Sequence, residues 1–238
     1  MFKSITEAFR LLNLDAPKNP LIAVFRHTED MTTDFENAKI TSDLYYISFK
    51  ENITGEFKYG RSSYDFQEGT LMFLSSNQVF TPQGGTGIDL NGWSILFHPD
   101  LIRNCNLGSE IKKYNFFHYS SNESLHLSDK EKKDLNEVVG KIEEEIGQNI
   151  DRYSQELIIH NLETILKYSK RYYDRQFYSR SNLNSNYLSE FEIFLDNYFE
   201  SNSQLENGLP NVTQCGKALQ MSGHYLSDLL KAETGKSL

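Results

Sequence analysis

The sequence predicts an α+β protein in which a β domain precedes a series of helices. Two observations carry this prediction. Residues 20–100 contain short runs rich in β-branched and aromatic residues, separated by turn residues, which is typical of an all-β barrel or sandwich. From residue 128 onward the apolar residues instead recur every three or four positions, which is the spacing of amphipathic helices.

The predicted β domain has four clear strand candidates. They are LIAVFRH (21–27), DLYYISFK (43–50), TLMFLSS (70–76) and WSILFH (93–98). A short amphipathic helix ending before Pro17 is expected in front of them, with apolar residues Phe2, Ile5, Phe9 and Leu12. Behind them we expect a short helix after Pro99 and a last strand near YNFFHYS (114–120).

Composition limits the class of protein. The chain has 238 residues, 38% of them hydrophobic and 24% charged, which describes a globular protein able to bury a sizeable core. Its net charge of −9 argues against an isolated nucleic-acid binder, because neutralising phosphates needs Lys and Arg. Cys105 and Cys215 form no CxxC motif, so neither a disulfide framework nor a zinc site is indicated. No apolar run approaches the roughly 20 residues of a membrane span, and a reducing cytoplasm fits.

Two long helices are predicted after the β domain. Ser128 and Glu131 have capping-box spacing at the start of the first, and the second covers about Arg152–Gln176. Their apolar stripes are Leu135, Val138, Val139, Ile142 and Ile146, then Tyr153, Leu157, Ile158, Leu162, Ile165 and Leu166. An intrachain helical hairpin and a dimer interface both fit this pattern. Residues 177–187 are rich in Ser and Asn and are the best linker candidate, and a further helix follows them.

The last segment, NVTQCGKALQMSGHYLSDLLKAETGKSL (211–238), predicts a helix, a short turn and a second helix. Gly216 stands where two crossing helices need a small residue, and Ser222 can cap the second helix. The buried side of this pair would be Val212, Cys215, Leu219, Met221, Leu226, Leu229 and Leu230. The opposite side carries His224, Ser227, Asp228 and Lys231, a polar face that suits a recognition helix in a major groove. A helical hairpin with a solvated face also fits.

The same segment resembles the first helix-turn-helix of the arabinose-regulator (AraC/XylS) family of bacterial transcription factors. The likeness rests on Leu-x-Met-Ser at the turn, Tyr-Leu-Ser in the second helix and Glu-Thr-Gly-Lys-Ser at its end. RYYDRQF (171–177) and GWSILFHPDLI (92–102) extend it over most of the chain. The resemblance implies a cupin-like sensor domain in residues 1–127, a helical linker or dimerisation region in 128–180 and a partial DNA-binding domain in 181–238.

The resemblance also implies roles for residues of the last helix. Ser222 would cap it and Tyr225 would hold it against its partner helix, whereas His224, Ser227, Asp228 and Lys231 would face DNA. This sequence departs from the family at Asp228, where a basic residue is common, and at Gln220, where Gly is frequent. A carboxylate at position 228 would either accept a hydrogen bond from a cytosine amine or repel phosphate.

The family's joining helix and second helix-turn-helix have no counterpart before Leu238, so the sequence is expected to be a fragment. From Tyr187 to Leu238, three lysines stand against seven acidic residues, a net charge of −4. Such an acidic unit lacks the sequence-independent attraction to phosphate. We expect no measurable specific DNA binding by these 238 residues alone at physiological salt.

No catalytic or metal site is predicted. The histidines form no His-x-His pair, and of His27, His98, His118, His126, His160 and His224 only the first two lie in the expected central strands. There is no Gly-x-Ser-x-Gly motif, Cys105 has no evident His partner, and the Gly-rich GGTGID reads as a turn. No cofactor is expected. Candidate residues for a small-molecule pocket are Phe25, Arg26, Tyr46, Phe73 and Trp93, although each also fits an ordinary core role.

The sequence therefore predicts a non-enzymatic, ligand-responsive transcription regulator. Its expected partners are double-stranded DNA, an unidentified small-molecule effector, a second copy of the chain and RNA polymerase, with no membrane. Two alternatives stay open. One is a metal-free cupin-type enzyme, such as an isomerase, with a helical tail, and the other is a sensor or interaction module without a DNA role.

Overall fold

The computed structural model describes residues 2–27, 40–51, 58–59, 62–63, 69–80, 92–120, 123–148, 151–179 and 181–236. They form a mixed α+β chain, which confirms the predicted class. The chain divides into two compact units. Unit 1 comprises Met1–Tyr114 and Leu125–Ser169, and unit 2 comprises Asn115–Ser124 and Lys170–Leu238.

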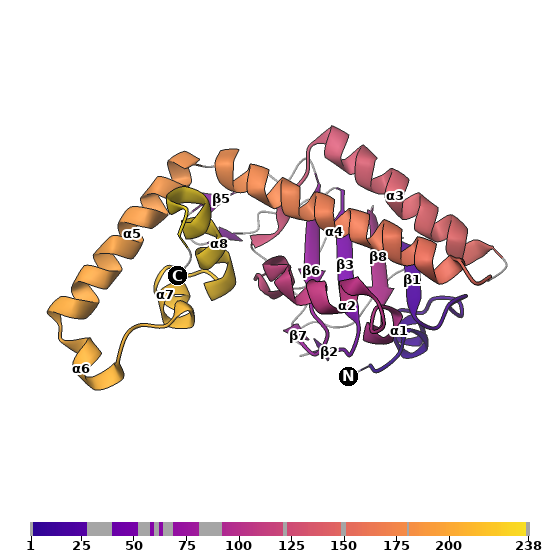
Figure 1. Cartoon of the computed structure of the whole chain (residues 1–238), viewed down its shortest axis with the longest axis horizontal. Coiled ribbons are helices and arrows are strands. Elements are labelled where there is room, and N and C mark those ends of the chain that lie inside the picture. The colour runs from indigo at the N-terminus through magenta and orange to yellow at the C-terminus, as the bar shows by residue number, and fades with distance from the viewer. Residues whose placement is uncertain are drawn as a thin grey trace. The chain divides into compact units, whose positions relative to one another are not determined.

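Unit 1 is built on one antiparallel sheet, and the four predicted strand runs are its four longest strands (Figure 1). In spatial order the strands are β1 (Ile22–Arg26), β8 (Gly92–Phe97), β3 (Tyr45–Lys50), β6 (Thr70–Leu74) and β9 (Leu125–His126). The described strands leave β1 and β9 as open edges and do not close into a barrel. Two short ribbons pair separately: β2 (Ile40–Thr41) with β7 (Val79–Phe80), and β4 (Lys58–Tyr59) with β5 (Ser62–Ser63).

One face of the sheet is covered by helix α3 (Asp129–Gly147), and α4 (Ser154–Ser179) follows it (Figure 1). The predicted capping box of Ser128 and Glu131 starts α3. Trp93 Nε1 donates a 2.7 Å hydrogen bond to Asn136 on α3. Most of both predicted apolar stripes is buried within the chain, in Leu135, Val138, Val139, Ile142, Ile158, Leu162, Ile165 and Leu166. For these residues the structure favours intrachain packing over a dimer interface.

The opposite face packs at one end against α1 (Ile5–Leu11), the N-terminal helix that the sequence predicts. Ser4 caps this helix by accepting from the Glu7 amide. Its buried residues Ile5 and Phe9 join Ala23 and Leu96 of the sheet in one apolar cluster. Phe25 and Tyr46 lie partly buried against that cluster.

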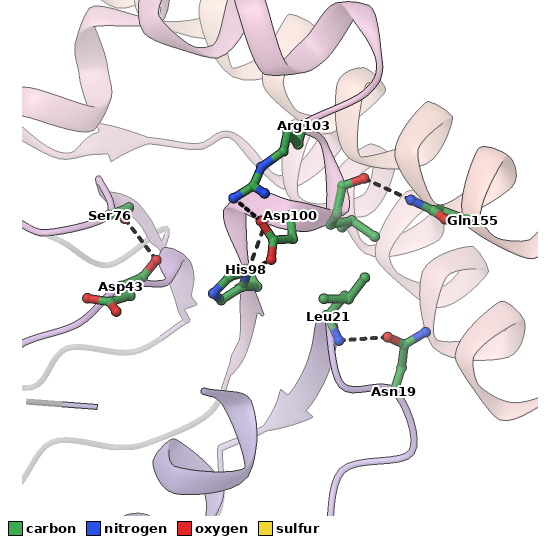
Figure 2. A network of polar contacts seen from close by, with 9 residues as sticks. Asn19, Leu21, Asp43, Ser76, His98, Asp100, Arg103 and Gln155 are labelled. Carbon is green, nitrogen blue, oxygen red and sulfur yellow. Dashed lines mark hydrogen bonds and ion pairs between the residues drawn. The ribbon is translucent and has the colours of Figure 1, made fainter. Parts of the chain in front are cut away.

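Polar contacts fix the end of β8 (Figure 2). After the strand, the His98 side chain caps the short helix η1 (Pro99–Leu101) by accepting from the Asp100 amide at 3.2 Å. Gln155 on α4 donates to the Leu101 carbonyl at 3.0 Å (Figure 2). The chain then forms α2 (Asn106–Glu110) and η2 (Ile111–Lys113). The short helix expected after Pro99 is thus present as a series of short turns.

Two predictions of local structure are wrong. Residues 114–120 form the 3-10 helix η3 (Asn115–His118) rather than a strand, because the adjacent Phe116 and Phe117 are both buried, which an alternating strand with one buried face does not allow. The expected linker at 177–187 is largely helical, since α4 reaches Ser179 and α5 begins at Ser181 and ends at Glu200. Phe177, at the start of the expected linker, is buried within α4.

Unit 2 ends in three further helices. They are α6 (Ser203–Asn207), α7 (Val212–Ala218) and α8 (Gly223–Thr234). The last two match the predicted pair of helices and the turn between them.

Candidate functional site

The α7–α8 pair is held by close backbone packing. A Cβ at position 216 would lie 2.7 Å from the Met221 carbonyl oxygen and 2.9 Å from the Gly223 amide nitrogen. A Cβ at position 223 would lie 2.9 Å from the Val212 carbonyl oxygen. Both positions therefore require glycine, as the sequence predicts for Gly216. Gln220 in the turn has a left-handed backbone, with φ of 59°.

Helix α8 has defined ends and a buried side. Ser222 Oγ accepts from the Tyr225 amide at 3.2 Å, which confirms the predicted N-cap. Gly235 closes the helix in a left-handed conformation. Leu226, Leu229 and Leu230 are buried as predicted. Tyr225 is also buried, and its ring lies 5.2 Å from that of Tyr119 and 5.1 Å from that of Phe177.

The polar face of α8 contains the other candidate DNA-facing residues. His224 and Lys231 are exposed, whereas Ser227 and Asp228 are partly buried. The Asp228 carboxylate accepts hydrogen bonds from Tyr119 OH at 2.5 Å and from Asn115 Nδ2 at 3.0 and 3.1 Å. The His224 ring lies 5.0 Å from that of His118.

A buried carboxylate meets the N-terminus of α8. Glu123, only 5% exposed, accepts from the Ser222 amide at 2.6 Å and from Ser222 Oγ at 2.5 Å. Its carboxylate also accepts from the Ser120 amide at 2.7 Å. Burial raises the pKa of Glu123, and these hydrogen bonds oppose the rise. The positive end of the α8 dipole also favours a negative charge at this point.

A second group of polar side chains lies on the sheet of unit 1, on the face that packs against α1. Ser94 is fully buried at the centre of this group. Its Oγ lies 2.7 Å from His27 Nε2, 3.0 Å from Tyr46 OH and 3.1 Å from Ser48 Oγ. Burial, with a smaller contribution from the Lys50 charge, lowers the pKa of His27 to about 4. We call His27, Tyr46, Ser48 and Ser94 the sheet cluster.

Two buried polar atoms at this face have no hydrogen-bond partner among the described residues. They are Nδ1 of His27 and Oγ1 of Thr70. The strand register places Thr70 opposite Lys50 and therefore on the same side of the sheet as Ser48. Unpartnered buried polar atoms lose their hydration without compensation, so a polar ligand at this face would relieve that cost.

The five residues predicted to bind a ligand divide between the two faces of the sheet. Phe25 lies opposite Ser94 in the register, so Phe25 and Tyr46 share the face of the sheet cluster. Arg26 and Trp93 lie on the other face, together with the buried Phe73. There Arg26 donates to both carboxylate oxygens of Glu143 on α3 at 2.9 and 2.5 Å. Arg26 is thus paired with a carboxylate of this chain, and the structure places two of the five residues, Phe25 and Tyr46, on the face of the sheet cluster and the other three on the opposite face.

Sequence reasoning missed Ser48 and Ser94 as members of a polar site. Ser48 lies two residues after Tyr46 in an apolar strand run, which predicts a shared face, whereas Ser94 joins that face only through the pairing of β8 with β3. Of the two histidines in the expected central strands, His27 contacts Ser94 and His98 contacts Asp100, so the two do not form a pair. Within the described residues there is no group of three or more His, Cys, Asp or Glu side chains able to hold a metal ion.

The chain matches no protein-family model, and no curated protein is significantly similar to it. None of the helices in the described part of the chain is long and apolar enough to cross a membrane.

Proposed function

We propose that this protein is a ligand-responsive, sequence-specific DNA-binding transcription regulator of the AraC/XylS type. In this proposal unit 1 is a cupin-like sensor for a small molecule, and α7 and α8 are a helix-turn-helix whose second helix reads the major groove. The protein would act in the cytoplasm as a homodimer and contact RNA polymerase when it activates a promoter.

The observation that carries the proposal is the construction of the α7–α8 pair. Backbone contacts at Gly216 and Gly223 fix the two helices closely together, and Ser222 sets the start of the second. This holds His224, Ser227, Asp228 and Lys231 on a rigid helix, on the side away from its buried leucines. A rigid helix with short polar side chains is what direct reading of base edges requires.

The sheet cluster supports the sensor part of the proposal. It combines hydroxyl groups, a neutral imidazole and the apolar Phe25 at one face of the sheet, which suits a small polar molecule such as a sugar. A pKa near 4 makes His27 a weak base at neutral pH, whereas general-base catalysis is most efficient near the working pH. The cluster therefore favours ligand binding over the alternative of an isomerase-like enzyme.

The proposal is tested by selecting duplexes from a random-sequence pool with the protein expressed from its complete gene, at a salt concentration of about 50 mM to limit the loss of electrostatic affinity. Recovery of a common sequence is expected. Lys231→Ala should then weaken binding to the selected duplex and to unrelated duplexes by the same factor. It should also reduce the slope of log K against log salt by about 1.

Lys141→Ala is the matched control, because it removes the same charge from an exposed position on α3. Failure to enrich any sequence, or equal effects of the two lysine substitutions, would reject the proposed role of α8.

A further inference from the structure

We propose that residues Asn115–Ser120 together with Glu123 and Ser124, here called the clasp, form an autoinhibitory contact that covers the reading face of α8. The inference rests on the proposed function and adds its regulation. The clasp and α8 belong to the same compact unit.

The first observation concerns Asp228, at the centre of the candidate reading face. Tyr119 and Asn115 of the clasp both donate hydrogen bonds to its carboxylate, at 2.5 Å and at 3.0–3.1 Å. Burial and the neighbouring Asp228 charge raise the pKa of Tyr119, so its hydroxyl keeps its proton and remains a donor at every physiological pH. These bonds occupy three of the acceptor positions of the Asp228 carboxylate that a base would otherwise use.

The second observation concerns the start of α8. The Glu123 carboxylate binds the amide and hydroxyl of Ser222, at 2.6 and 2.5 Å. Helix N-termini are where DNA-binding proteins commonly hold a phosphate, because free amides and the helix dipole favour an anion there. The clasp thus supplies a carboxylate at the position where a DNA phosphate would bind.

The clasp is held in place by contacts within unit 2. Tyr173 of α4 donates to the Glu123 carbonyl at 3.1 Å, and Gln176 donates to the Ser124 carbonyl at 3.4 Å. The Phe116 ring stacks on that of Tyr173 at 5.5 Å. The clasp is thus fixed to α4 at one side and bound to α8 at the other, so in this proposal opening means the separation of α8 from the clasp.

The clasp is joined through the chain to a strand that pairs with β6, next to the sheet cluster. The clasp continues directly into β9, whose His126 pairs with Thr70 of β6. Thr70 Oγ1 is one of the two unpartnered polar atoms at the face of the sheet cluster. A ligand that bonds there would act on a strand pair adjoining the clasp, so binding and opening become coupled if the ligand favours the open arrangement.

The test is the variant Tyr119→Phe, which deletes one charge-assisted hydrogen bond to Asp228 and keeps the ring contacts with Tyr173 and Tyr225. Removing that bond should raise the fraction of open molecules and tighten binding of the protein from the complete gene to its selected duplex about tenfold. Amide hydrogen exchange in α8 should become faster by a similar factor. The matched control is Tyr178→Phe, a hydroxyl deletion at a tyrosine that is 84% exposed on α4, with no expected change in either measurement.

The outcomes are distinct. Faster exchange together with tighter duplex binding supports the clasp. Unchanged exchange in α8, or faster exchange with unchanged affinity, overturns the clasp and leaves the proposed function standing. If neither the wild-type protein nor Tyr119→Phe enriches any sequence from the random pool, the proposed function fails and the clasp fails with it.

Discussion

His27 should make the stability of unit 1 depend on pH. Its pKa is about 4 in the folded protein and is close to 6.5 in an unfolded chain. Because the folded pKa is depressed, His27 contributes its full stabilisation above pH 6.5, and that contribution is lost as the pH falls towards 4. Each pH unit between the two values costs about 1.4 kcal/mol, so acidification from pH 7.5 to pH 5 should lower the free energy of unfolding by about 2 kcal/mol through this residue alone.

The measurement is urea denaturation at pH 7.5 and pH 5, followed by the fluorescence of Trp93. This is the only tryptophan of the chain, and it is buried in unit 1, which also contains His27. In His27→Gln the loss between the two pH values should be about 2 kcal/mol smaller than in the wild type, because the amide does not titrate and can still bond to Ser94. His160→Gln, an exposed histidine on α4, is the control and should behave like the wild type. Equal pH dependence in wild type and His27→Gln would refute the reasoning.

Three further substitutions test the backbone geometry. Gly216→Ala should destabilise the α7–α8 pair by about 2 kcal/mol, because the new methyl group meets backbone atoms at 2.7 and 2.9 Å, and faster hydrogen exchange in both helices would show it. Gly140→Ala in α3 meets no atom within 4 Å and should stabilise unit 1 by up to about 1 kcal/mol in urea denaturation; a loss of stability would contradict this. Gln220→Gly should slow exchange in α7 and α8, since glycine relieves about 1 kcal/mol of strain at a φ of 59°, and unchanged protection would count against that strain.

The sequence was most informative where one local rule decides the structure. The four strand runs, the capping box at Ser128 and the cap at Ser222 all appear as predicted. In each case the signal lies within a few neighbouring residues, as alternation of apolar side chains or as a hydroxyl at a helix start.

Predictions failed where distant residues decide the outcome. YNFFHYS has the composition of a strand, but Phe116 stacks on Tyr173, and Tyr119 packs against Tyr173 and Tyr225, all far away in the sequence. Those contacts favour a compact turn that buries neighbouring rings over an extended strand.

The candidate sites show the same division. The polar face of α8 follows from helical spacing, but the bonds of Asp228 to Asn115 and Tyr119 join residues more than 100 positions apart, and no local pattern reveals them. In the sheet, Phe25 and Tyr46 have the aromatic character of pocket walls, whereas Ser48 and Ser94 are small hydroxyl residues within apolar strands, and only their contacts in the structure mark them as part of the site.

The most direct test of the central claim is a change of base preference. Ser227 lies on the polar side of α8, and Ser227→Arg places there a side chain that pairs bidentately with guanine. If α8 reads the major groove, selection from random duplexes with the variant, expressed from its complete gene, should recover the wild-type sequence altered to guanine at one base pair, with a discrimination of about 1–3 kcal/mol. An unaltered recovered sequence would contradict the account.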